Sequence, residues 1–473
     1  MDFEKRMRRQ SFRVIISEVI MVVTVIVMVA VLALVVSGYW LGSDFKVERQ
    51  GMLQINSLPT GASVAVDGDA PWYQRTNTSK VLSSGEHHIV LTRDGYDSWE
   101  KTVDIREGLL YRLHYPRLFL ADRDETSVYD ATATTYATVS KDTNTMLLVN
   151  PTTDWTLLKL DSDSLESKHL DIAPYFDSVS LAPDATAGLY SGSIISSQWS
   201  GDNAHLLIQS RSGDSDEWVL LDIKNPKNSI NLTREFATNF TDMRIYDDSA
   251  SQLLVVRNNN LHRIDVSARQ ISAAIIKNVQ FYDFYDREIV YVASTEVATD
   301  QTTADKTYEI GIVDNGDITT FSEIAADATT RAYLSRFYDS KYLTVVTGGR
   351  VSVYQRDAIK EPTIYEADFT PTDIKISLGG DFVFLSSGTQ VAVVDMESLR
   401  LVNWALDTAK YHWLDSHMLY TVNDGALSVY DYDGLNHRTL STGASSRFPV
   451  AITNDRWLYY FSDNEIMREI IAR

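Results

Sequence analysis

Cysteine is absent from this chain of 473 residues. Without thiols the protein can form no disulfide, no thiolate zinc site and no cysteine nucleophile. The sequence also lacks the G-x-S-x-G elbow of serine hydrolases, the G-x-x-x-x-G-K-[ST] phosphate loop and the H-E-x-x-H zinc motif. We therefore predict no enzyme, no catalytic, cofactor-binding or metal-binding residue, and no cofactor.

Basic side chains are scarce, with 43 Lys and Arg against 64 Asp and Glu and a net charge of −21. A surface with this charge repels phosphate backbones, so nucleic acid is excluded as a partner. Acidic side chains favour solubility, which is the simplest reason for the excess. Attraction of cations or basic polymers is the alternative.

Charge is missing altogether from residues 19–42, where VIMVVTVIVMVAVLALVV runs from Val19 to Val36. As a helix rising about 1.5 Å per residue, this segment spans roughly 36 Å, enough for a bilayer core of about 30 Å. Tyr39 and Trp40 follow where an interfacial aromatic belt lies. We predict one transmembrane α-helix at residues 19–42; a cleaved signal peptide is the alternative.

The residues before this segment set its predicted orientation. They include Lys5, Arg6, Arg8, Arg9 and Arg13, and basic flanks stay in the cytoplasm. Residues 1–18 are thus predicted to be a basic cytoplasmic tail and residues 43–50 a linker. The predicted localisation is the cell membrane, single-pass, with the C-terminal domains outside the cytoplasm.

Residues 51–114 are predicted to form a small β domain. Polar and apolar positions alternate around Leu53 and Ile55, as in a half-buried strand. Turn residues separate such segments. The turn residues that we single out are Pro59, Gly61, Ala62, Asp67 and Gly68.

The segments LQINSLPTGASVAVDG and LSSGEHHIVLTRDGYDSWEKTVDI resemble the PEGA domain family. The shared pattern is a Pro-x-Gly-Ala turn, a Val-x-Val-Asp-Gly hairpin, a Gly-x-His strand and a Gly-Tyr turn. Thr60 stands where the family name has Glu, which the turn does not require. The resemblance implies a small extracytoplasmic β-sandwich, often beside a membrane anchor, and no catalysis. It also implies that His88 satisfies a turn.

Residues 115–473 contain a repeat in which a short apolar strand ends in a polar turn before the next strand. The turns fall at Ser140-Lys141-Asp142, Ser200-Gly201-Asp202, Asp247, Asp286, Asp339, Gly380-Asp381, Asp415 and Asn454-Asp455. Four strands in roughly 45 residues are typical of a β-propeller blade. We predict an all-β ectodomain with a β-propeller of eight blades, seven being the alternative. The segment Tyr115–Leu120 is predicted to complete the last blade.

The copy SSQWSGDNAHLLIQSRSGDSDEWVLLDI is similar to the repeat of TolB-type propellers, and the others resemble WD-like propellers. This likeness concerns architecture, and propellers serve binding, scaffolding and catalysis alike.

Several polar clusters have a structural interpretation. His412, Asp415 and His417 superficially form a metal cluster, but their spacing places them on a strand end, a turn and the next strand. Asp161-Ser162-Asp163 and Asp431-Tyr432-Asp433-Gly434 are interpreted as turns, because neither has the later Glu of an EF-hand loop, with calcium binding at an acidic loop as the alternative. Residues 298–306 are interpreted as a hairpin insertion, with a partner-contacting loop as the alternative.

These features favour a membrane-anchored, extracytoplasmic binding or scaffold protein that presents a β-propeller to a protein or cell-envelope glycan. The alternative is a lyase or hydrolase acting in the central channel, which predicts carboxylates or histidines converging at one mouth. An assembly factor that pairs with another membrane protein is a third possibility.

Overall fold

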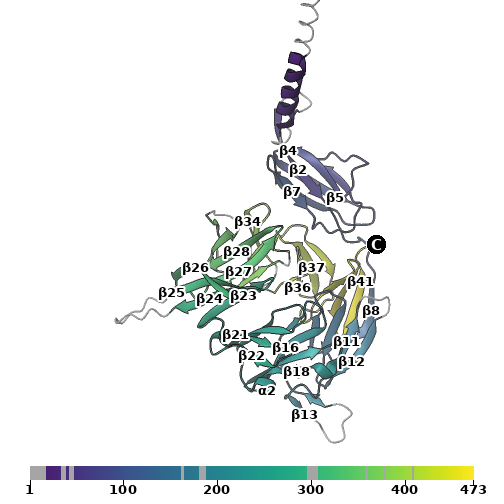
Figure 1. Ribbon diagram of the computed structural model, residues 1–473. Helices are drawn as coiled ribbons and strands as arrows, with labels where there is room; N and C mark the ends of the chain where they lie inside the picture. Colours follow the sequence, from purple (N-terminus) through teal and green to yellow (C-terminus); the bar gives the residue numbers. More distant parts are fainter. Residues whose placement is uncertain are drawn as a thin grey trace, which may run out of the picture. The chain divides into compact units, whose positions relative to one another are not determined.

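The computed structural model describes residues 18–33, 39–41, 47–160, 165–180, 188–295, 307–356, 361–377, 379–406, 408 and 410–473. The chain divides into two compact units, Met1–Asp122 and Arg123–Arg473. β-strands make up most of the regular structure in both units (Figure 1).

The prediction of a membrane-spanning helix at residues 19–42 is not supported. The described helix covers residues 18–33 and begins beside Val19, and Tyr39 and Trp40 belong to a strand, β1 (Tyr39–Leu41). No helix among the described residues is long and apolar enough to cross a membrane.

The predicted single-pass membrane localisation is therefore wrong. Strand β1 pairs with the next strand, with Tyr39 opposite Arg49 and Leu41 opposite Val47, where the prediction had a continuous helix. Val36 and the basic tail at residues 1–17 lie outside the described residues.

Two sheets form the body of the first unit. One has the order β1-β2-β4, with β7 parallel to β2, and the other has the order β3-β5-β6. The strands are β2 (Val47–Ile55), β3 (Ser63–Val66), β4 (Thr78–Ser83), β5 (Gly85–Thr92), β6 (Trp99–Ile105) and β7 (Leu110–Leu113).

Alternating burial explains why these strands form two facing sheets. In β6 every second residue is buried, which places Trp99, Val103 and Ile105 on one face. They share a core with Leu53 of β2 and Ile89 of β5, all almost fully buried. The turn residues occupy the positions that turns require: Gly61, Asp67 and Gly68 have positive φ, and Ala62 is buried.

The second unit contains, over its described residues, eight four-stranded antiparallel sheets. The first four consist of β9 (Tyr136–Val139), β10 (Thr145–Val149), β11 (Asp154–Lys159) and β12 (Glu166–Asp171); β15 (Ser193–Trp199), β16 (His205–Ser212), β17 (Ser215–Asp222) and β18 (Ile230–Asn231); β19 (Asp242–Ile245), β20 (Gln252–Arg257), β21 (Asn260–Asp265) and β22 (Gln270–Ile271); and β23 (Val279–Tyr285), β24 (Glu288–Thr295), β25 (Thr307–Asp314) and β26 (Asp317–Ala325).

The other four sheets continue the pattern along the chain. They consist of β27 (Arg331–Phe337), β28 (Ser340–Thr347), β29 (Arg350–Gln355) and β30 (Thr363–Glu366); β31 (Asp373–Ile376), β32 (Phe382–Ser387), β33 (Gln390–Asp395) and β34 (Arg400–Ala405); β35 (His412–Trp413), β36 (Met418–Asn423), β37 (Ala426–Asp431) and β38 (Arg438–Ser441); and β39 (Ala451–Thr453), β40 (Trp457–Ser462), β41 (Glu465–Ile470) and β8 (Glu125–Asp130). The remaining elements are β13 (Val179–Ser180), β14 (Leu189–Tyr190), the 3-10 helix Pro226–Asn228 and α2 (Leu232–Phe236).

Apolar cores join neighbouring sheets of the second unit. Leu147 of the first sheet shares a core with Leu206 of the second, and Leu207 of the second sheet shares one with Leu253 of the third. A further core joins the last sheet to the first, through Tyr459 and Leu158. The sheets therefore follow one another from blue through teal and green to yellow and return to the start (Figure 1).

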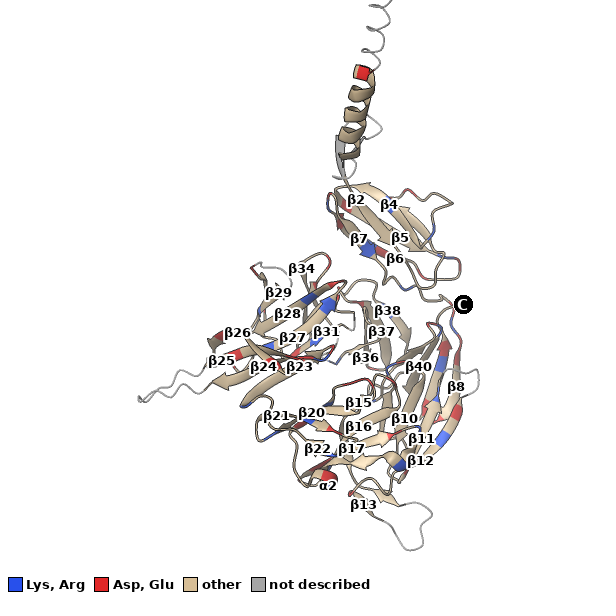
Figure 2. Ribbon diagram, in the orientation of Figure 1, with Lys and Arg blue, Asp and Glu red and all other residues tan. Residues whose placement is uncertain are grey.

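The strand that completes the last sheet is β8, not the predicted segment Tyr115–Leu120. β8 pairs with β41, with Thr126 opposite Arg468. The predicted segment belongs to the first unit instead, where Leu118 is part of the core and its N–H donates to the carbonyl of Leu58. Asp and Glu are spread over many strands and turns of the second unit, with Lys and Arg between them (Figure 2).

Candidate binding site at the first turns of the sheets

The turns between the first and second strand of each sheet form a recurring feature, which we call the first turns. All eight turn positions predicted from the sequence fall in these connections. In the first sheet, Ser140 Oγ donates to Asp142 Oδ1 and accepts from the Thr145 N–H. In the second, Ser200 Oγ makes the equivalent contacts with Asp202 and the His205 N–H. The Ser-x-Asp pattern is thus a turn-forming device.

Neighbouring first turns are joined by hydrogen bonds. The Lys141 N–H donates to Asn203 Oδ1 over 2.9 Å, and the Asp202 N–H donates to the Asp248 carbonyl over 3.0 Å. Between the last and first sheets, Thr453 Oγ1 donates to the Thr143 carbonyl over 2.7 Å. These bonds hold the first turns at fixed positions relative to one another.

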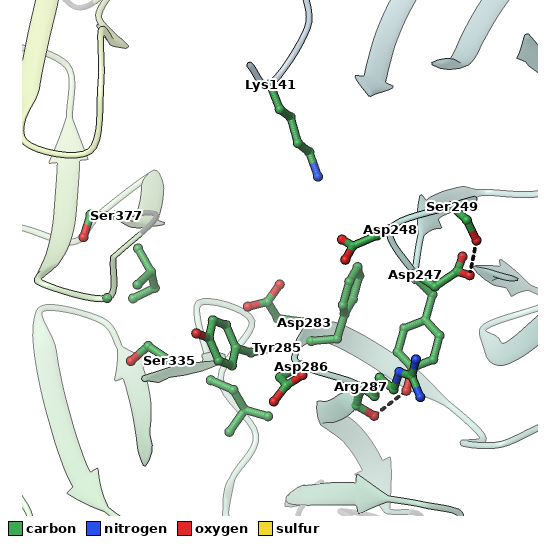
Figure 3. A pocket seen from close by; sticks show the side chains of 15 residues that line it. Lys141, Asp247, Asp248, Ser249, Asp283, Tyr285, Asp286, Arg287, Ser335 and Ser377 are labelled. Carbon is green, nitrogen blue, oxygen red and sulfur yellow. Dashed lines mark hydrogen bonds between the residues drawn. The ribbon is translucent and has the colours of Figure 1, made fainter. Parts of the chain in front are cut away.

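A cavity of about 810 Å³ lies among these turns. Its lining comes from the first, third, fourth, fifth and sixth sheets, so the cavity lies where the first strands converge (Figure 3). Lys141, Asp248, Asp283, Asp286 and Arg287 bring charge to it. Their convergence from separate sheets makes this cavity the candidate binding site.

Three carboxylates besides Asp247 line this cavity, those of Asp248, Asp283 and Asp286. Asp248 and Asp283 point into the open space in Figure 3, with the Lys141 amine above them. Within the described part of the chain no ion pair engages the Asp248 or Asp286 side chain, and Asp283 Oδ1 lies 3.6 Å from Arg244 Nη1. Burial raises the pKa of Asp283 to about 6, and the nearby Arg244 opposes this rise.

Asp247 also lines the cavity but has a structural role. Its carboxylate accepts hydrogen bonds from Ser249 Oγ over 2.8 Å and from the Gln252 N–H over 2.9 Å. Burial opposes ionisation, but the hydrogen bonds from Ser251, Gln252 and Ser249 lower the pKa of Asp247. This carboxylate therefore shapes the turn.

Sequence reasoning placed Asp247 and Asp286 in turns but missed Lys141, Asp248, Asp283 and Arg287 as site residues. The pairs of adjacent charged residues Asp247-Asp248 and Asp286-Arg287, within the repeating turns, are the sequence feature that could have indicated a site there. No histidine is among the residues described as lining the cavity.

The predicted turn residues of the first unit form a separate cluster. The peptide bond before Pro59 is cis, and the Gly61 and Ala62 N–H groups both donate to Thr76 Oγ1, over 2.9 and 3.0 Å. Asp67 Oδ1 accepts from the His88 N–H over 2.8 Å. These contacts fix the turns of the first unit.

The polar clusters named from the sequence are drawn into local contacts. Asp415 Oδ1 accepts from the His417 N–H over 2.8 Å, while the His412 ring stacks on Tyr420 with centroids 5.3 Å apart. The Gly434 N–H donates to the Asp431 carbonyl, as in a turn. Residues 161–163 and 298–306 lie outside the described residues.

Residues 50–116 match the PEGA domain family. No curated protein matches the chain. Among solved structures, the β-propeller domain of Myceliophteria thermophila Cps50 (Swd1) is 11% identical, with 74% of this chain and 100% of that chain covered and a TM-score of 0.41. Kluyveromyces lactis Hsv2 is 14% identical, over 58% of this chain and 91% of that one, with a TM-score of 0.37. The tricorn protease is 11% identical, over 75% of this chain and 38% of that one, with a TM-score of 0.40.

A PEGA domain and a β-propeller-like unit are thus present in this chain. The second assignment depends on the chain's own sheet order, since the likenesses to solved structures are too distant to support more. The finer likeness to TolB-type repeats stays a prediction.

Proposed function

We propose that this chain is a non-enzymatic binding or scaffold protein and that its second unit is an eight-bladed β-propeller. The sheet order supports eight blades, because each four-stranded sheet follows the last along the chain and β8 completes the final one. Closure in this way covers a sheet edge that would otherwise pair with other chains.

The partner is a protein segment that carries a cationic side chain. The convergence of Asp248, Asp283 and Asp286 on one cavity supports this proposal. A Lys or Arg side chain entering the cavity gains charge-assisted hydrogen bonds with Asp248 and Asp286, which no ion pair engages within the described residues, and competes with Arg244 for Asp283. The hydrogen bond from the Asp202 N–H to the Asp248 carbonyl holds the turn of Asp248 in place, which reduces the entropic cost of binding.

Peptide binding to the full chain tests this proposal. The probes are short labelled peptides with blocked ends, one with three arginines and one with three glutamates, followed by fluorescence anisotropy. The variant is the triple substitution Asp248→Asn, Asp283→Asn and Asp286→Asn. We expect it to weaken binding of the arginine peptide at least tenfold, and we expect the glutamate peptide to bind the wild type more weakly than the arginine peptide does.

The matched control removes the same charge at the other end of the sheets. Asp214, Asp424 and Asp463 are exposed in turns between second and third strands, and the triple Asn variant at these positions has the same net charge as the first variant. Equal loss of affinity in both triples would mean that only net charge attracts the peptide, and would overturn the proposed site.

A hydrolase or lyase acting at the same cavity is the second candidate function. It is favoured by the raised pKa of Asp283, because a carboxyl group with a pKa of about 6 can donate a proton near neutral pH. Mass spectrometry of the arginine peptide after prolonged incubation separates the two. An intact peptide supports binding alone, whereas shortening by the wild type but not by Asp283→Asn supports catalysis.

A further inference from the structure

A second cavity, of about 460 Å³, lies between the third and fourth sheets of the second unit. Tyr246 and Gln252 line it from the third sheet, and Asn315 and Gly316 from the turn between β25 and β26. Two arginines, Arg263 and Arg287, also line it. It therefore brings two guanidinium groups together in a chain whose net charge is −21.

Arg263 is held in place without a carboxylate partner. It belongs to β21, and its guanidinium lies over the Tyr246 ring at 4.9 Å from the centroid. Its Nε is buried and has no hydrogen-bond partner, and no ion pair engages its guanidinium within the described part of the chain. A buried donor that stays unsatisfied destabilises a fold, so this position is costly unless a ligand completes it.

Arg287 approaches the same cavity from the fourth sheet. It lies in the tight turn between β23 and β24, where its φ is 69°. The Tyr246 hydroxyl donates to the Arg287 carbonyl, which fixes this turn against the third sheet. Tyr246 thus positions both arginines, one through its ring and one through its hydroxyl.

Asp247 is the acidic group in the lining, and it does not neutralise the pair. Its oxygens accept hydrogen bonds from Ser249, Ser251 and the Gln252 N–H. Among the residues that line the cavity, two guanidinium groups stand against one carboxylate, which leaves the lining itself with an excess positive charge.

We propose that this cavity binds an oxyanion, a phosphoryl or carboxylate group, between Arg263 and Arg287. Guanidinium groups present planar pairs of N–H donors that match the oxygens of both anions. Binding satisfies the buried donor of Arg263 and balances the excess charge. The volume allows the oxyanion to be part of a larger molecule.

Titration of the full chain with simple anions tests the site. Inorganic phosphate, sulfate and succinate are added at constant ionic strength, with chloride as the reference, and binding is measured by calorimetry and by the rise in Tm. We expect saturable binding of phosphate or succinate, and the tighter of the two identifies the group that the site recognises.

The variants are Arg263→Gln and Arg287→Gln, and each is expected to weaken anion binding at least tenfold. Arg263→Lys keeps the charge but loses the planar fork, and we expect an intermediate loss. Arg257→Gln is the matched control. Arg257 is the last residue of β20 and belongs to the same third sheet as Arg263, but it lies at the end of the sheet opposite the first turns. Arg257→Gln should bind anions as the wild type does.

Stability of the anion-free variants gives a second readout. Because Arg263 lacks a partner for its buried donor, Arg263→Gln should keep or raise the Tm in chloride while losing the rise that phosphate causes. The proposal is overturned if the wild type binds none of the anions below about 10 mM, or if the folded Arg263→Gln and Arg287→Gln variants bind them as tightly as the wild type.

Discussion

His87 Nδ1 lies 2.6 Å from Asp67 Oδ2, and this contact ties the turn after β3 to strand β5. The other ring nitrogen, Nε2, lies 2.9 Å from the Ser83 carbonyl oxygen. Asp67 Oδ1 accepts from the His88 N–H as well. One carboxylate thus makes two cross-links within the first unit.

The pKa of Asp67 gives this contact a pH dependence. The hydrogen bond from His87, followed by that from the His88 backbone, lowers the pKa of Asp67 below its ordinary value of 3.8. A carboxylate with a lowered pKa in the fold stabilises it above the unfolded pKa, and this contribution disappears as the pH falls through the folded value. The first unit should therefore lose stability below about pH 4.

Asp67→Asn should remove this acid-sensitive contribution. We expect roughly 1 kcal/mol or less at pH 7, because the carboxylate is about half exposed. Hydrogen exchange of the β3 and β5 amides between pH 3 and 7 measures it. Asp69→Asn is the control, since Asp69 is more exposed and lies 3.9 Å from Lys80. An unchanged acid response in Asp67→Asn would contradict the assignment.

Trp155 should be among the most sensitive positions of the second unit. It is fully buried and packs on Phe176 and Tyr190, with ring centroids 5.3 and 5.2 Å away. Trp155→Ala opens a cavity between the first two sheets and should cost about 3–5 kcal/mol of unfolding free energy. Urea unfolding followed by far-ultraviolet circular dichroism measures the loss. Trp72→Ala, at a residue 87% exposed, should change stability by about 0.5 kcal/mol or less.

Gly201 sets the position of Asp248 in the candidate site. A Cβ at residue 201 would lie 2.1 Å from Asp248 Oδ1, so Gly201→Ala must displace that carboxylate. We expect a three- to tenfold loss of affinity for the arginine peptide with the fold retained. Gly388→Ala is the control, because no atom lies within 4 Å of a Cβ there although φ is +60°. It should cost stability and leave affinity unchanged; the opposite result would contradict the role of Asp248.

Arg123 and Glu469 should stabilise the closure of the second unit. Arg123 Nε donates to Glu469 Oε1 over 2.5 Å, and the Glu469 side chain is 2% exposed. Burial raises the pKa of Glu469 and Arg123 opposes this. Arg123→Ala leaves a buried carboxylate unpaired and should cost roughly 3–5 kcal/mol.

Chemical unfolding measures this loss, and the double variant Arg123→Ala, Glu469→Gln should recover part of it. Arg350→Ala, at an exposed arginine, should have little effect. Equal stability of Arg123→Ala and Arg350→Ala would show that the pair does not hold the closure.

The sequence predicted the repeating sheets well because their signals are local. Alternating burial and the Ser-x-Asp turns depend on neighbouring residues, as Ser140 and Asp142 illustrate. Closure was harder to predict. The segment Leu118–Leu120 is apolar but packs in the first unit, whereas β8 has mostly exposed side chains and no apolar signature.

The candidate site could be predicted only in part. Asp283 lies on a strand, and it meets Asp248 and Lys141 only because separate sheets converge. No pattern of neighbouring residues in the sequence indicates that these three side chains lie close together. The apolar run at residues 19–42 was misinterpreted for a different reason. Hydropathy alone did not indicate that residues 39–41 pair as a strand.

Asp283 should make cation binding depend on pH. Burial raises its pKa to about 6, against the influence of Arg244. A raised pKa means that the fold favours the neutral form of the carboxyl group. The contribution of this group to stability is therefore full below the ordinary pKa of 3.8 and is lost as the pH rises through about 6. A cationic ligand prefers the ionised form, so affinity should change in the opposite direction.

Affinity for the arginine peptide should therefore increase about tenfold between pH 5 and pH 7 and then level off, following the ionised fraction of a group with a pKa of about 6. Anisotropy titrations at pH 5, 6, 7 and 8 and constant ionic strength measure this. Asp283→Asn should bind more weakly at pH 7 and show a flat profile, while Asp463→Asn keeps the wild-type profile. A flat wild-type profile, or the same slope in Asp283→Asn, would mean that another group controls binding.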